Sequence, residues 1–143
     1  MIDISKAMRT LTRETPALAD ERVELRDAVG RVLAENIVAD SDLPPFDRSQ
    51  MDGYAVVASD SLAAPVDLIV VGESAAGRGW HQRMKRGEAV RIMTGAPVPA
   101  GADAVQRVEL TSGWDGETVR IREPVRKGMS VVRRGAELSL IHI

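Results

Sequence analysis

The stretch Leu43–Val57, LPPFDRSQMDGYAVV, constrains the fold more than any other part of the sequence. Pro44 and Pro45 fix the backbone φ angle and lack N–H donors, so the chain enters the stretch extended rather than helical. Gly53 permits backbone conformations that other residues avoid, and the apolar and aromatic residues 54–57 favour a strand. The sequence therefore predicts a polar loop that leads directly into a strand.

Three side chains of this loop carry oxygen atoms suited to binding. Asp47, Ser49 and Asp52 offer carboxylate and hydroxyl groups within six positions. A polar loop on a rigid strand is a common base for a binding site. The same residues also suit an ordinary turn, in which Asp and Ser side chains accept hydrogen bonds from nearby backbone N–H groups. For Asp47 and Ser49 both interpretations remain open.

A second polar loop, within IMTGAPVPAGADAV at residues 92–105, follows an apolar strand predicted at residues 88–93. Thr94 and Gly95 would present a hydroxyl group and two backbone N–H groups at the end of that strand, an arrangement that suits anion binding. If the two strands are neighbours in a sheet, the two polar loops converge in space.

The motifs SQMDGYAV and IMTGAPVPAGADAV, in this order, resemble the amino-terminal part of the molybdopterin molybdenumtransferases, the enzymes that complete molybdenum cofactor. The segments VELRDAVGRVLAENIVADSDLPPFD and KGMSVVRRGAEL are also similar, so the resemblance extends to about Leu138. It implies catalytic roles for Asp52 and Thr94. It further implies substrate contacts from Ser49, Gly95, Arg134 and Glu137.

The sequence departs from the family pattern at two places. Gln50 stands where the family usually has Ala, a change that a loop tolerates. Residues 134–137 read Arg-Gly-Ala-Glu where the family usually has Arg-Gly-Glu-Asp, so Glu137 carries its carboxylate one methylene further. Arg133 and Arg134 would point to opposite faces of a strand, so only one of them could reach a shared ligand. A solvated basic strand end is the alternative.

The resemblance implies a reaction in which molybdate is transferred to adenylylated molybdopterin with release of AMP, assisted by Mg²⁺. Family members are longer and carry a downstream α/β domain that holds most of the nucleotide and cation ligands. We therefore expect these 143 residues to contribute half of a cleft that a partner subunit completes in a homodimer, and to be inactive alone. The alternative is a non-catalytic interaction module, as a related domain is in gephyrin.

Composition argues against several other classes of protein. The formal net charge is −2 and basic residues are interspersed with acids, which argues against nucleic-acid binding. The chain has no cysteine, which fits a reducing compartment such as the cytoplasm, and His81 and His142 alone give no zinc-ligand spacing. No apolar run reaches the length of about 18 residues that a membrane span needs.

Hydrophobic spacing predicts an α+β chain with an amino-terminal helix and strand region (1–43), followed by a β-rich, barrel-like domain (44–132). The resemblance implies that residues 133–143 are a truncated return segment. We expect a helix from Ile4 that Pro16 ends, a strand at 22–26, and a second helix after Asp27. The resemblance implies that the first region packs against later chain, so its apolar residues should be exposed here. Short apolar runs separated by Gly and Pro predict strands at 54–57, 68–71, 89–93, 104–108, 119–122 and 130–132.

Overall fold

The computed structural model describes residues 3–16 and 18–138. The chain divides into two compact units, Met1–Ile37 and Val38–Ile143, called unit 1 and unit 2 below. Each unit is described by itself. The assignment of segments to domains of the transferase stays a prediction.

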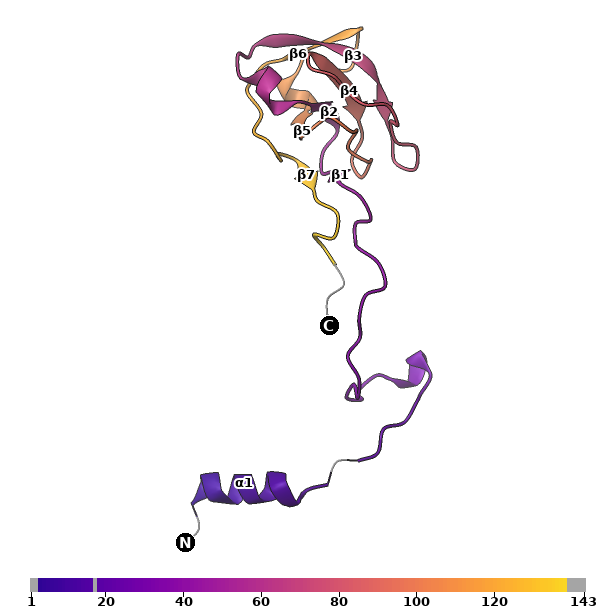
Figure 1. Ribbon diagram of the computed structural model, residues 1–143, viewed down its shortest axis with the longest axis vertical. Coiled ribbons are helices and arrows are strands. Elements are labelled where there is room, and N and C mark those ends of the chain that lie inside the picture. The colour runs from indigo at the N-terminus through magenta and orange to yellow at the C-terminus, as the bar shows by residue number, and fades with distance from the viewer. Residues whose placement is uncertain (1–2, 17, 139–143) are drawn as a thin grey trace. The chain divides into compact units, whose positions relative to one another are not determined.

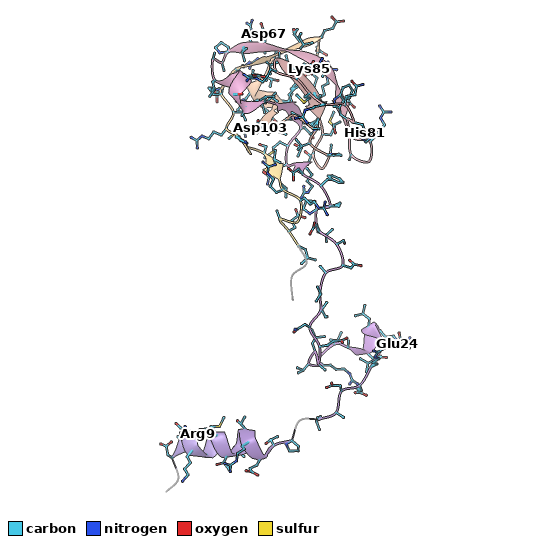
Figure 2. All side chains as sticks on the ribbon, in the orientation of Figure 1. Arg9, Glu24, Asp67, His81, Lys85 and Asp103 are labelled. Carbon is cyan, nitrogen blue, oxygen red and sulfur yellow. The ribbon has the colours of Figure 1, made fainter. Side chains whose placement is uncertain are left out.

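Unit 1 contains the predicted amino-terminal helix, α1 (Ile4–Glu14). Asp3 caps it, since Asp3 Oδ1 accepts hydrogen bonds from the N–H groups of Ser5 at 2.8 Å and Lys6 at 3.3 Å. The helix ends at Glu14, and its C-cap is Thr15, the residue before Pro16. Its side chains, with Arg9 labelled in Figure 2, project into solvent.

The strand predicted at residues 22–26 and the helix predicted after Asp27 are both wrong. A single 3₁₀ turn, η1 (Leu25–Asp27), is followed by turns and extended chain. The apolar residues of this segment are exposed, and Val32 reaches 94%. Most helical stability comes from packing of an apolar face, and none of the described residues in unit 1 is buried. The expected exposure of this region is therefore confirmed.

Unit 2 is built on a five-stranded sheet with the strand order β5-β2-β4-β3-β6 (Figure 1). Its strands are β2 (Gly53–Val56), β3 (Val66–Ser74), β4 (Glu88–Ile92), β5 (Ala104–Arg107) and β6 (Thr118–Ile121). β2 runs antiparallel to β4 and β5, whereas β3 runs parallel to β4 and antiparallel to β6. The predicted strands are thus confirmed to within a few residues.

The sheet curls because the chain beyond β5 turns back onto β6. After the 3₁₀ turn η3 (Val108–Leu110), Arg122 N donates to Leu110 O and Ser112 N donates to Arg120 O, each at 3.0 Å. The result is a curled half-barrel, which confirms the α+β, barrel-like expectation. Another 3₁₀ turn, η2 (Ala58–Ser61), follows β2.

Both faces of this sheet are covered, which explains the continuous apolar run in β2. Tyr54 and Val56 belong to one buried cluster, and Ala55 belongs to the other with Val90 of β4. Gly53 is required at the start of β2, because a Cβ atom there would lie 2.0 Å from Gln106 O of the neighbouring strand. The first polar loop is therefore attached to a strand that packing holds on both sides.

A two-stranded ribbon adjoins this sheet. It pairs β1 (Arg48–Ser49) antiparallel with β7 (Val131–Val132). On its other side β1 meets residues 96–98, where Ser49 N donates to Ala96 O at 3.0 Å and Val98 N donates to Asp47 O at 2.9 Å. The first polar loop thus lies between the second polar loop and the late segment of the chain.

Candidate functional site

Asp52 and Thr94, the two predicted catalytic residues, are in direct contact. β2 begins at Gly53 opposite Ile92, where β4 ends, so the loops before β2 and after β4 meet at one edge of the sheet. Asp52 Oδ1 accepts hydrogen bonds from Thr94 N at 2.6 Å and from Thr94 Oγ1 at 2.8 Å. The predicted convergence of the two polar loops is confirmed.

These hydrogen bonds control the charge of Asp52. The backbone N–H of Thr94, and then its hydroxyl, lower the pKa of the Asp52 carboxyl below its usual value, because both donors favour the ionised form. Asp52 is therefore a carboxylate at neutral pH. Both residues are exposed, and Asp52 Oδ2 has no hydrogen-bond partner within the described parts of the chain. One anionic oxygen is thus left to face a ligand or water.

The predicted anion cradle at Thr94 and Gly95 is wrong. Thr94 N donates to the Asp52 carboxylate, and Gly95 N donates to Ser49 O at 2.9 Å. Both amide donors are therefore used within the protein. A fixed carboxylate occupies the position that an incoming anion would need, and its charge repels a second anion. The sequence pattern identified the donors but not the side chain that takes them.

Ser49 lies below the surface. Its residue is 0% exposed, and its hydroxyl donates to Met51 O at 2.6 Å and accepts from Met51 N at 3.2 Å. This geometry favours the loop-stabilising interpretation over ligand contact.

Arg134 and Glu137 both form ion pairs with residues 42–48, at the start of the first polar loop. Arg134 Nε lies 2.7 Å from Asp42 Oδ2, and an Arg48 guanidinium nitrogen contacts the Glu137 carboxylate. Arg133 pairs in turn with Asp47. These three ion pairs, Asp42–Arg134, Asp47–Arg133 and Arg48–Glu137, are called the clasp below.

Asp47 accepts hydrogen bonds from the side chain of Arg133 and from the backbone of Arg134. The backbone N–H of Arg134, which lies 2.9 Å from Asp47 Oδ1, lowers the pKa of the Asp47 carboxyl most. Burial opposes this shift, and the side chain of Arg133 adds to it. Asp47 thus joins two chain segments, as the loop-stabilising interpretation requires. The adjacent Arg133 and Arg134 pair with different carboxylates, Asp47 and Asp42, and do not share a ligand. Both arginine side chains are also exposed, so the solvated strand end stays an alternative.

Asp42 and Arg48 were missed as partners from the sequence. The sequence does contain complementary charges, with acids at 42 and 47 and arginines at 133 and 134. They can be matched only when the antiparallel β1–β7 register is known.

The described ranges, 3–16 and 18–138, contain no group of three or more acidic, His or Cys side chains that could hold a metal ion. His81 is exposed on unit 2 (Figure 2), and His142 lies outside the described residues. In the same ranges none of the helices has the length and hydropathy required to cross a membrane.

Comparisons with known proteins agree with the sequence resemblance. The model of the family described as "MoeA N-terminal region (domain I and II)" matches residues 2–140. The molybdopterin molybdenumtransferase of Haemophilus influenzae is 35% identical, over the whole of this chain and 39% of the relative. That of Bacillus subtilis is 41% identical, over 80% of this chain and 27% of the relative.

A solved structure is similar over almost the whole chain. The molybdopterin biosynthesis moeA protein from Pyrococcus horikoshii OT3 matches with a TM-score of 0.82 and 36% identity, over 95% of this chain and 37% of that one. The chain thus spans well under half the length of the relatives it matches. It belongs to the family of the MoeA N-terminal region, and its curated relatives are molybdopterin molybdenumtransferases.

Proposed function

We propose that this chain forms the amino-terminal part of an enzyme that transfers molybdate to adenylylated molybdopterin with release of AMP. The observation that supports the proposal is the contact between Asp52 and Thr94. Each residue lies in one of the two family-like motifs, and the contact creates an exposed carboxylate with one unbonded oxygen. The names of the relatives supply the class of substrate.

The charge of Asp52 limits what it does in this reaction. A carboxyl group with a lowered pKa is ionised at neutral pH, so it is not a proton donor there. Because it repels anions, direct contact with molybdate or a phosphate group is unfavourable. Asp52 is better suited to accept hydrogen bonds from the N–H groups of a pterin ring, or to orient the water molecule that cleaves the adenylate. Thr94 holds the carboxylate in place for either role.

Gly95, Arg134 and Glu137, which we also propose as substrate-binding residues, are engaged within the protein in this structure. Gly95 directs its N–H into the protein, and Arg134 and Glu137 are engaged in the clasp. Contact of Arg134 or Glu137 with substrate therefore requires that an ion pair exchange its partner. We propose the exposed carboxylate of Asp52, held by Thr94, as the first point of substrate contact.

The resemblance implies Mg²⁺, a partner subunit and a cytoplasmic homodimer. Among the described residues the acids do not form a magnesium ligand set, so no step of the proposal passes through the ion. We propose that its ligands, and the rest of the cleft, come from the remainder of the full-length protein and from the partner subunit. The 143-residue chain alone is accordingly expected to be inactive.

The test uses a full-length protein that carries this segment. Asp52→Asn keeps the shape of the side chain but removes the charge, and we expect a loss of about 10²-fold or more in molybdenum insertion. Insertion is measured by activation of an apo-molybdoenzyme. Asp67→Asn is the matched control, because Asp67 is also an exposed Asp with a lowered pKa but lies on β3, paired with Arg120. Equal activity of Asp52→Asn and wild type would contradict the proposal.

A further inference from the structure

Ser49 is hydrogen-bonded to Met51, the residue before Asp52, and to Gly95, the residue after Thr94. It is fully buried in β1, between residues 96–98 on one side and β7 on the other. A residue without exposed surface cannot bind a ligand directly. Its influence on the site has to pass through its hydrogen bonds.

The backbone of Ser49 holds the loop that carries Thr94. Ser49 O accepts from Gly95 N at 2.9 Å, and Ser49 N donates to Ala96 O at 3.0 Å. Two hydrogen bonds to adjacent residues fix both the position and the direction of this turn. Thr94 is therefore held immediately before the two residues to which Ser49 is bonded.

The side chain of Ser49 holds the residue before Asp52. Its hydroxyl donates to Met51 O at 2.6 Å and accepts from Met51 N at 3.2 Å. Met51 O belongs to the peptide group that joins Met51 to Asp52, so the hydroxyl fixes the orientation of that peptide. This orientation sets the direction in which the Asp52 side chain leaves the backbone.

We propose that Ser49 is a positioning residue that fixes Asp52 and Thr94 relative to each other, one through its hydroxyl group and the other through its backbone. The effect on hydrogen bonding in the pair is independent of the reaction. Only the consequence for activity rests on the proposed function.

The structure also predicts that the fold survives loss of the hydroxyl. The backbone carbonyl of Asp52 accepts a hydrogen bond from Val108 N at 3.1 Å, so the backbone after Asp52 stays attached to the chain beyond β5. The backbone bonds of Ser49 to the second polar loop do not need its side chain. Ser49→Ala should thus loosen the peptide before Asp52 and leave the sheet intact.

The test is an NMR titration of the Asp52 carboxyl group in the 143-residue chain. In Ser49→Ala we expect the pKa of Asp52 to rise towards its usual value and the Thr94 amide to exchange faster with solvent, because the hydrogen bonds to Thr94 are loosened. Ser49→Thr retains a hydroxyl and should restore part of both effects. An unchanged Asp52 pKa together with unchanged Thr94 exchange in Ser49→Ala would overturn the proposal.

Ser61→Ala is the matched control. Ser61 is also fully buried, and its hydroxyl donates to Ala58 O at 2.7 Å and accepts from Val125 N at 2.9 Å, away from the pair. It loses the same atom from the same kind of environment, so it should leave the Asp52 pKa unchanged. A rise in Ser61→Ala equal to that in Ser49→Ala would mean a general loosening of the fold, and would also overturn the proposal.

A measurement on the wild type covers the case in which Ser49→Ala does not fold. The Met51 and Gly95 amides, which donate to Ser49, should exchange as slowly as the Val108 amide that anchors Asp52. Free exchange of either amide would contradict the positioning role.

Activity of the full-length protein then separates the two proposals. If both hold, Ser49→Ala lowers kcat by on the order of 10²-fold, as expected for a misplaced group, with a smaller effect on KM. A raised Asp52 pKa without loss of activity would support the positioning role and contradict the catalytic role of Asp52.

Discussion

Units 1 and 2 contain similar apolar residues but use them differently. Leu25 in unit 1 is 88% exposed, whereas Leu68 in β3 of unit 2 is 2% exposed. Unit 2 buries its apolar side chains on both faces of one sheet, while unit 1 has a capped helix and no buried residue among those described. The described apolar residues that follow α1 in unit 1 form no helix longer than one 3₁₀ turn and no strand, whereas those of unit 2 pack on both faces of the sheet. The two polar loops that carry Asp52 and Thr94 are attached to strands of this packed sheet, which fixes their positions.

The largest expected effect comes from the two leucines. Leu68→Ala should lower the free energy of unfolding of unit 2 by about 2–5 kcal/mol, because it leaves a cavity in the core. Leu25→Ala removes an exposed side chain and should change stability by less than about 0.5 kcal/mol. Urea unfolding measures the free energy of unfolding of both variants. A loss for Leu25→Ala as large as that for Leu68→Ala would show that Leu25 is packed.

Two glycines sharpen the same comparison. Gly53→Ala brings a Cβ atom against the backbone of β5, so it should cost about 2–3 kcal/mol by forcing strands apart. Gly30 in unit 1 has a positive φ of 81°, but a Cβ atom there would meet open space, so Gly30→Ala strains only the local turn. Thermal unfolding should therefore show a lower Tm for Gly53→Ala and an unchanged main transition for Gly30→Ala.

A substitution at Ser130 should stabilise the fold, by less than Leu68→Ala or Gly53→Ala destabilises it. It has φ 56°, a left-handed conformation that costs a non-glycine residue about 1 kcal/mol. Ser130→Gly removes this strain but gains chain entropy when unfolded, so we expect a net stabilisation of about 0.5 kcal/mol.

The control for Ser130 lies in unit 1. Ser5 is in the first turn of α1, where a glycine relieves no strain, so Ser5→Gly should only reduce the helical signal in circular dichroism. A loss of stability in Ser130→Gly would mean that the hydroxyl group, rather than the backbone conformation, matters at that position.

The smallest effect is expected from pH. Folding lowers the pKa values of Asp47 and Asp52, so their contribution to stability is present above about pH 4, the usual range for Asp. It is lost as pH falls through the lower values of the folded state. Because both carboxylates are in contact with solvent, the effect is modest. Asp47→Asn should show a weaker loss of stability between about pH 4 and pH 2 than wild type, and an identical loss would contradict this assignment.

The sequence predicted the elements of unit 2 better than those of unit 1 for a physical reason. Strand runs such as residues 54–57, which follow Gly53, find partner strands within the chain. The helix predicted after Asp27 had the right spacing but no described surface to pack against. Local patterns specify which face is apolar, and they do not show whether the covering surface is present.

The site was also predicted in part. The loops that carry Asp52 and Thr94 were identified because polar residues next to apolar runs mark the ends of strands. Which donor meets which acceptor depends on the register of β2 and β4, so the hydrogen bond from Thr94 N to Asp52 was missed. The clasp was missed for the same reason, because Arg133 and Asp47 lie far apart in the sequence and meet only through β1 and β7.

The central claim is that two polar loops converge to hold Asp52 as an ionised, solvent-facing carboxylate. The most direct measurement is the carboxyl ¹³C titration of Asp52 in the wild-type chain and in Thr94→Val, which lacks the hydroxyl but keeps the N–H. We predict a wild-type midpoint below that of an Asp in an unstructured peptide, and a rise towards it in Thr94→Val. A wild-type midpoint at or above the peptide value, unaffected by Thr94→Val, would contradict the claim.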